Sequence, residues 1–255
     1  MSLALFNLDG RTALVTGSSA GIGHALTKGL AGAGARVVLN GRDADRLDAA
    51  AKSLEGAGPA VHQAAFDVTD RAGVEAAVER IERDIGPIDI LINNAGIQRR
   101  MALEDFPDET WREVMRTNLD SAFIVGQVVA RGMIPRRKGS IINICSVNSE
   151  LGRPTIAPYT ATKGGLKMLT KGMAVDWGKY GIRVNGIGPG YFKTELNQAL
   201  YTNAQFSDWL TGRTPLSRWG EVDELIGAVV FLASDAASFV SGHILYVDGG
   251  VTAAL

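Results

Sequence analysis

The stretch TGSSAGIG, residues 16–23, decides the fold of this chain. Its glycines Gly17, Gly21 and Gly23 come directly after the apolar pattern TALV and directly before the helical pattern IGHALTKGLAG. Glycine permits a sharp turn and lets the backbone approach a pyrophosphate, whose charge is stabilised by free N–H groups at the start of a helix. Such glycines also permit close packing of helix on strand. The spacing G-x-x-x-G-x-G at a strand-to-helix turn nevertheless favours dinucleotide binding.

The rest of the chain continues this alternation of strand and helix. Continuous apolar strand patterns separated by helical patterns are typical of a parallel sheet covered on both faces. With right-handed crossovers, they predict an α/β, Rossmann-type, doubly wound fold with a mostly parallel seven-stranded sheet. The strand patterns are at 12–17, 35–41, 60–68, 88–96, 140–146, 182–190 and 243–250, and the later helices are predicted at 108–135, from 157 onward, near 195–211 and at 221–234.

Composition indicates one globular domain over residues 1–255. Hydrophobic residues make up 46% of the chain and glycine 31 positions, and no repeat, linker or low-complexity tract interrupts it. Lysine and arginine number 26 against 27 acidic residues, so no net charge would attract nucleic acid or an anionic membrane. The basic run PRRKG at 135–139 is expected to be a solvated loop.

The first ten residues, MSLALFNLDG, lack the basic region and apolar core of a signal peptide, and no stretch approaches the ~20 apolar residues of a membrane span. We therefore expect a cytoplasmic protein. The single cysteine, Cys145, cannot form an internal disulfide and is expected to be a small core residue. His24, His62 and His243 show no metal-ligand spacing, so no metal site is predicted.

The end of the second strand pattern, NGRD, bears on the choice of dinucleotide. A carboxylate there would bind an adenosine ribose 2′-hydroxyl, but Gly41 stands at that position and Arg42 follows it. A guanidinium can instead hold a 2′-phosphate in a bidentate manner. Asp43 is a rival acid, although its position before ADRLDAA suits a helix N-cap. NADP is the first choice and NAD the second.

A second motif, APYTATKGG at 157–165, places Tyr159 and Lys163 four residues apart, on one face of a predicted helix. That spacing alone suits an ordinary surface pair. With TGSSAGIG, FDVTD (66–70), NNAG (93–96) and PGYFKT (189–194), however, the order and spacing of the motifs resemble the short-chain dehydrogenase/reductase family over essentially the whole chain.

The resemblance implies an oxidoreductase with a catalytic set of four residues. Ser146 matches the serine that binds the substrate oxygen, and the nearby Ser149 has the wrong spacing for that role. Tyr159 matches the general acid/base, Lys163 the residue that lowers its pKa and binds the nicotinamide ribose, and Asn118 the residue that holds a relay water through its main chain. A phenol titrates near pH ~10, so a neighbouring ammonium is needed for it to act as a base at neutral pH.

The resemblance also implies the cofactor contacts. Asp67 and Val68 match a pair that holds the adenine, and a segment at about 191–215 is expected to cover the substrate. Since many NADP-preferring relatives carry a basic residue where this chain has Ala20, Arg42 would act largely alone. The predicted cofactor-binding residues are Gly17, Ser19, Gly21, Ile22, Gly23, Arg42, Asp67, Val68, Asn94, Ala95, Gly96, Tyr159, Lys163, Pro189, Gly190, Phe192 and Thr194.

Within the family, NNAGIQRR, ICSVNSELGRP, PGYFKTE and FVSGHILYVDGG resemble the branch that interconverts D-gluconate and 5-keto-D-gluconate. A sugar acid carries a carboxylate and needs a cationic anchor. Arg100 is the preferred anchor, with Arg99 and Lys193 as alternates. Ser146 is also expected to contact the substrate. Glu150 could receive a substrate hydroxyl, or it could pair with Arg153.

Other readings stay open. A reductase of a 3-oxoacyl thioester, a small cyclic ketone or a naphthol precursor would need an apolar or carrier-binding groove around Trp209 and Trp219, which could equally be core or interface residues. A catalytically silent nucleotide sensor is possible on the same fold, but it would need no Ser146, Tyr159 and Lys163 set. The resemblance further implies a homotetramer that pairs the long helices and docks the carboxyl-terminal strands.

Overall fold

Seven parallel strands form one sheet in the computed structural model, which describes residues 3–254. The strand order is β3-β2-β1-β4-β5-β6-β7, and each neighbouring pair is parallel, which confirms the predicted doubly wound sheet. The chain crosses from one half of the sheet to the other after β3, so the point at which the strand order reverses lies between the neighbouring strands β1 and β4. The strands are β1 (Thr12–Val15), β2 (Arg36–Gly41), β3 (Ala60–Ala65), β4 (Ile88–Asn93), β5 (Gly139–Ile144), β6 (Ile182–Pro189) and β7 (Ile244–Val247).

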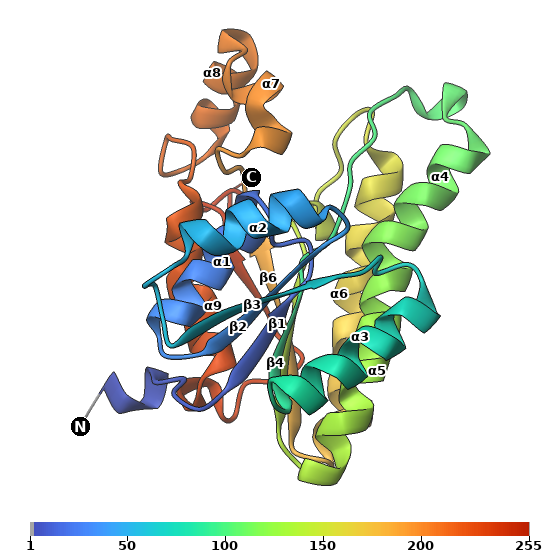
Figure 1. The fold of residues 1–255 in the computed structure, drawn as a ribbon. Helices are drawn as coiled ribbons and strands as arrows, with labels where there is room; N and C mark the ends of the chain where they lie inside the picture. The colour runs from blue at the N-terminus through green and yellow to red at the C-terminus, as the bar shows by residue number, and fades with distance from the viewer. Residues whose placement is uncertain (1–2, 255) are drawn as a thin grey trace.

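Helices cover both faces of this sheet (Figure 1). One face carries α1 (Gly21–Gly32), α2 (Ala44–Ser53) and α9 (Ile226–Ala233), and the other carries α3 (Arg71–Asp84), α4 (Asp108–Met115), α5 (Ser121–Arg136) and α6 (Ala157–Gly178). Two further helices, α7 (Gln198–Tyr201) and α8 (Ala204–Arg213), stand apart from both layers, at the top of Figure 1. Single 3-10 turns lie at Leu3–Phe6, Leu103–Asp105, Val147–Ser149, Glu195–Asn197, Val222–Leu225 and Asp235–Ala237.

Alternation along β1 explains why the sheet is apolar on both faces. Leu14 packs into the core cluster under α3, α5 and α6, whereas Ala13 and Val15 pack into the cluster under α1 and α9. Successive strand residues point to opposite faces, so a strand covered on both sides is apolar at most of its positions. All four residues of β1 are buried. The continuous apolar pattern in the sequence is therefore a direct record of this double burial.

The expected helix over 108–135 is not continuous. After α4 the chain forms a π-helical turn over Arg116–Asp120, and α5 follows from Ser121. Such turns are rare and occur mostly as single-turn bulges inside helices, frequently at functional sites. The turn contains Asn118, which lies opposite the carboxyl end of β4.

The two later helical predictions are also interrupted. Asn203 lies between α7 and α8 and its side chain accepts a hydrogen bond from the Phe206 amide (2.9 Å), so a new helix begins there. Between 221 and 234 a 3-10 turn precedes α9, and Glu221 and Glu224 form a capping box at its start. Within residues 3–254, no helix combines the length and the apolar character needed to cross a membrane.

Candidate active site

A cleft of about 1540 Å³ runs across the carboxyl ends of the central strands. It exceeds the ~300–1,000 Å³ typical of a small-molecule site and can hold a dinucleotide together with a substrate. Of the predicted site residues, Asn118, Glu150, Phe192 and Lys193 do not line it. Those that do are Gly17, Ser19, Gly21, Ile22, Gly23, Arg42, Asp67, Val68, Asn94, Ala95, Gly96, Arg99, Arg100, Ser146, Tyr159, Lys163, Pro189, Gly190 and Thr194.

The first strand-to-helix turn has the geometry of a phosphate cradle. Gly17 and Gly21 adopt φ values of 60° and 58°, which side chains disfavour. A Cβ on Gly23 would lie 2.4 Å from the side-chain amide nitrogen of Asn94, so only glycine fits there. The N-cap of α1, Ala20, provides no side-chain acceptor, which leaves the first N–H groups of the helix available to an anion. These residues fit a pyrophosphate.

Asn94 braces this turn from β4. Its side-chain amide donates to the carbonyl oxygens of Thr16 and Gly17, each at 2.9 Å, and the amides of Asn94 and Ala95 donate to the Thr16 hydroxyl. The carboxyl ends of β1 and β4 are thereby tied together where the strand order reverses. This is the position at which open α/β sheets bind their ligands.

Arg42 follows β2 and lines the cleft, and its side chain is 77% exposed. Its nearest acid is Asp67, with Nη1 3.9 Å from Oδ2. Burial acts to raise the pKa of Asp67, but two hydrogen bonds from Thr69 and the charge of Arg42 hold the pKa below its ordinary value. Asp43 caps α2 by accepting from the Arg46 amide, which confirms the N-cap interpretation.

Tyr159 and Lys163 lie on the first two turns of α6, facing the end of β5. The Lys163 ammonium is nearly buried, with 4% of the residue exposed; it donates to the Ile144 carbonyl at 2.6 Å and lies 5.5 Å from the centre of the Tyr159 ring. Ser146 follows β5, and its hydroxyl accepts from the Asn148 amide at 3.1 Å. The structure thus gathers three residues that the sequence separates.

Burial shifts the pKa values of Tyr159 and Lys163. Burial raises the pKa of Tyr159, and its hydrogen bond with Ser146 only partly offsets that effect. Burial also lowers the pKa of Lys163 to about 8. Burial of the phenol therefore dominates, and the pKa of Tyr159 lies above its ordinary value; the role of Lys163 in lowering that pKa stays a prediction. Lys163 still remains mostly protonated at neutral pH.

Asn118 sits behind the cleft, in the π-helical turn. Its side-chain oxygen accepts from the Ile97 amide at 2.7 Å, and its nitrogen donates to the Ile97 carbonyl at 2.8 Å and to the Thr162 hydroxyl at 3.3 Å. The side chain therefore joins the loop after β4 to α6. Its main-chain role toward a relay water stays a prediction.

Ser149, Glu150 and Phe192 do not line the cleft. Ser149 donates to the Lys163 carbonyl at 2.9 Å and so supports α6. Glu150 pairs with Lys167 and accepts from the Tyr246 hydroxyl at 2.7 Å, so the structure does not show the alternative in which it pairs with Arg153. The Phe192 side chain lies in the core cluster under α9, with 3% of the residue exposed.

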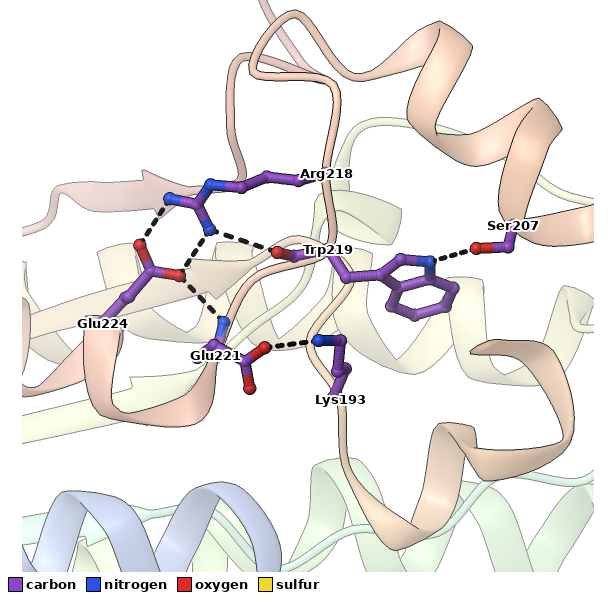
Figure 2. Close-up of polar contacts among 6 residues, drawn as sticks. All are labelled: Lys193, Ser207, Arg218, Trp219, Glu221 and Glu224. Carbon is purple, nitrogen blue, oxygen red and sulfur yellow. Dashed lines mark hydrogen bonds and ion pairs between the residues drawn. The ribbon is translucent and has the colours of Figure 1, made fainter. Parts of the chain in front are cut away.

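The three candidate carboxylate anchors differ in their partners. Arg99 forms a bidentate pair with Glu113, with one contact at 2.8 Å. Lys193 pairs with Glu221 at 2.5 Å, as Figure 2 shows. Arg100 donates only to the Gln98 side-chain oxygen at 3.0 Å, and within residues 3–254 it has no carboxylate at ion-pair distance. Of these three candidates, Arg100 is therefore the one whose charge is not already paired.

The two ends of the segment 193–220 lie side by side and are joined by backbone pairing. Phe192 and Gly220 form an isolated parallel bridge, and the Lys193 amide donates to the Gly220 carbonyl at 3.0 Å. In Figure 2 the Trp219 indole nitrogen reaches across to the Ser207 hydroxyl of α8 (2.8 Å), while Arg218 pairs with Glu224. This segment includes most of the predicted covering segment 191–215, of which Tyr191 and Thr194 line the cleft.

Cys145 and the histidines do not form a second reactive centre. Cys145 is buried in a core cluster, and burial raises its pKa to about 11, which confirms the expectation of a core residue. The part of the chain that the structure describes contains no group of three or more potential metal ligands.

Sequence reasoning missed four arginines that line the cleft. Arg46 lies one turn beyond Arg42, and the helical spacing with the Asp43 cap is a signal that could have placed it there. Arg153 lies in a loop, where no periodicity predicts an orientation. Arg112 lies on α4 and Arg116 is the first residue of the π-helical turn, whose altered geometry the sequence pattern does not reveal.

Comparisons with known proteins agree with this geometry. A family model described as enoyl-(acyl carrier protein) reductase matches residues 17–252. Gluconate 5-dehydrogenase of Gluconobacter oxydans is 59% identical over 98% of both chains, and 5-keto-D-gluconate 5-reductase of Escherichia coli is 51% identical over 98% of this chain and 99% of the relative. The crystal structure of a gluconate 5-dehydrogenase from Burkholderia cenocepacia, in complex with NADP and tartrate, has a TM-score of 0.96 and 57% identity, with 98% of each chain covered.

Replacing Lys163 by methionine should stabilise the protein more at pH 7 than at pH 10, relative to wild type. The folded-state pKa of about 8 lies below the ordinary 10.5, so wild type carries the cost of a buried charge at pH 7 and loses that cost as the pH rises through this range. Melting temperatures at both pH values measure the difference, with Lys52→Met as the exposed-lysine baseline. If Lys163→Met changes the melting temperature by the same amount at pH 7 and pH 10, after the change in Lys52→Met is subtracted, the lowered pKa of Lys163 is contradicted.

Proposed function

Because the chain belongs to the short-chain dehydrogenase/reductase family, we propose that it transfers a hydride between NADP(H) and a secondary alcohol or ketone of a sugar acid. The substrate pair is D-gluconate and 5-keto-D-gluconate. One observation carries the proposal: Ser146, Tyr159 and Lys163 meet in a cleft of dinucleotide size, beside Arg100, which has no carboxylate partner. NADP is the preferred cofactor and NAD the weaker one.

The chain's own residues divide the binding of the dinucleotide. The turn at residues 17–23 and the start of α1 would hold the pyrophosphate, and Arg42 the 2′-phosphate. Asp67 and Val68 would contact the adenine, and Pro189, Gly190 and Thr194 the nicotinamide end. When bound, the nicotinamide supplies the hydride chemistry.

Proton transfer falls to Tyr159. During oxidation its phenolate oxygen takes the proton of the substrate hydroxyl, and during reduction the phenol returns it. The Ser146 hydroxyl donates a hydrogen bond to the substrate oxygen and so orients it toward Tyr159. The Lys163 ammonium, which lies over the Tyr159 ring, stabilises the phenolate. This stabilisation is needed because burial raises the pKa of the Tyr159 phenol. Asn118 supports the relay from the π-helical turn.

Arg100 would bind the carboxylate of the sugar acid. Its competitors Arg99 and Lys193 are already neutralised by Glu113 and Glu221. The reading as a thioester or cyclic-ketone reductase gains no support, because neither Trp209 nor Trp219 lines the cleft. A nucleotide sensor would not need the catalytic cluster.

We further propose a homotetramer that works in the cytoplasm. The outward faces of α5 and α6 carry large exposed apolar side chains, Phe123 (43%), Met168 (60%) and Val175 (80%), which a partner copy could cover. The edge strand β7 pairs only with β6 among the described strands and could dock a second copy. Native mass measurement tests this assembly, and a monomer contradicts it.

The wild-type enzyme should reduce NADP with D-gluconate, and Tyr159→Phe should lower kcat by at least ~1,000-fold, because a phenyl ring cannot transfer the proton. The change removes one oxygen and should leave NADP affinity within about 3-fold, since the phenolic oxygen provides no more than one neutral hydrogen bond to the cofactor. Absorbance of NADPH and fluorescence titration measure the two effects. Substantial residual turnover would remove Tyr159 from this role, and a wild type active only on uncharged carbonyls would refute the substrate assignment.

Arg42→Ala should raise the Michaelis constant for NADP by about 10-fold to 100-fold, since it removes a charge-assisted contact to the 2′-phosphate. The constant for NAD, which lacks that phosphate, should change little and serves as the internal control. Steady-state kinetics with both cofactors at saturating gluconate measure the effect. Equal changes for both cofactors would show that Arg42 does not read the phosphate.

A further inference from the structure

A second cation, Arg153, shares the cleft with Arg100. We propose that Arg153 and Arg100 together bind the substrate carboxylate, and that aromatic side chains of the covering segment hold Arg153 in position. This inference rests on the proposed sugar-acid function and adds a residue that determines specificity.

The contacts of Arg153 leave most of its hydrogen-bonding capacity free. The guanidinium carbon lies 4.9 Å from the centre of the Phe206 ring, and Nη1 lies 3.5 Å from the Tyr191 hydroxyl. Within residues 3–254 no carboxylate pairs with Arg153. A guanidinium has five N–H donors, and one planar edge can hold a carboxylate in a bidentate manner. The stacking on Phe206 fixes the plane without using those donors.

The charge of the cleft also favours an anion at this point. Arg100 and Arg153 both line the cleft, and the loops that carry them are joined by a hydrogen bond from the Met101 amide to the Thr155 carbonyl at 3.0 Å. In keeping with this placement, burial and the positive charge of Arg153 lower the pKa of Arg100. Of the five acids that line the same cleft, three lie within ion-pair distance of another arginine: Glu113 of Arg99, Glu195 of Arg46 and Asp67 of Arg42. A carboxylate placed between Arg100 and Arg153 would relieve their repulsion.

The aromatic support of Arg153 is itself anchored. Trp219 contacts Tyr191 edge-on, with ring centres 5.9 Å apart and planes at 90°, and lies 6.3 Å from Phe206. Figure 2 shows that the Trp219 indole is fixed by its hydrogen bond to Ser207. The position of Arg153 thus depends on residues 191–219, which gives this segment a role in choosing the substrate as well as covering it.

The test compares D-gluconate with D-gluconamide, its uncharged analogue, in Arg153→Gln. We expect kcat/KM for gluconate to fall by about 10-fold to 100-fold, the range of one charge-assisted hydrogen bond, and that for gluconamide to change by less than about 3-fold. Turnover of gluconamide also shows that the variant is folded. Arg83→Gln, an exposed arginine on α3 outside the cleft, is the matched control and should leave both substrates unaffected.

Phe206→Leu keeps both arginines but removes the ring under Arg153. It should lower kcat/KM for gluconate less than Arg153→Gln does, again without a matching loss for gluconamide. Equal losses for both substrates in Arg153→Gln would overturn the assignment, because they would indicate general damage to the cleft.

Calorimetric titration of D-gluconate into the protein–NADP complex separates this inference from the proposed function. If wild type binds gluconate without oxidising it and Arg153→Gln weakens the binding at least about 10-fold, the two-arginine site stands and the proposed reaction fails. If wild type oxidises gluconate and Arg153→Gln changes neither binding nor kcat/KM, only this inference fails. Failure of wild type both to bind and to oxidise gluconate overturns both.

Discussion

A buried ammonium with no carboxylate partner is the constraint on which the rest of the site depends. Lys163 is held against the end of β5 by its hydrogen bond to the Ile144 carbonyl, and no acid among the described residues neutralises it. A buried charge without a counterion is costly for stability. In the proposed mechanism the same charge stabilises the phenolate of Tyr159, whose formation burial disfavours. On that mechanism, stability is given up for catalysis at this position.

The cleft separates three tasks along its length. In the proposed function, backbone groups of the turn after β1 would hold a phosphate, the cluster at the start of α6 would move a proton, and Arg100 with Arg153 would bind a carboxylate. The first two tasks lie on rigid elements braced by Asn94 and Asn118. The third depends on the segment beyond β6, which is held in place by the Phe192–Gly220 bridge and by the hydrogen bond from the Trp219 indole to Ser207. Substrate choice is thus assigned to the part of the fold least constrained by the core.

The apolar strand patterns predicted the sheet and its order of elements, because double burial leaves a strong local signal. The sequence pointed to Ser146, Tyr159 and Lys163 as a set only through the resemblance of its motifs to the family, since spacing alone suited an ordinary surface pair. It did not predict the π-helical turn around Asn118, since apolar spacing continues through it unchanged. Nor could it separate Arg99, Arg100 and Lys193, whose ion-pair partners come from distant elements. Arg153 escaped notice for the same reason: Phe206 and Tyr191, which position it, lie 53 and 38 residues further along the chain.

The most direct test of this account is the pH dependence of kcat/KM for D-gluconate oxidation at saturating NADP. If the Lys163 charge makes Tyr159 an effective base in the working complex, the rate should rise with pH and level off with an apparent pKa below ~10, the ordinary value of a tyrosine phenol. An apparent pKa at or above ~10 would contradict the account, because it would show that the buried ammonium does not stabilise the phenolate when the enzyme works.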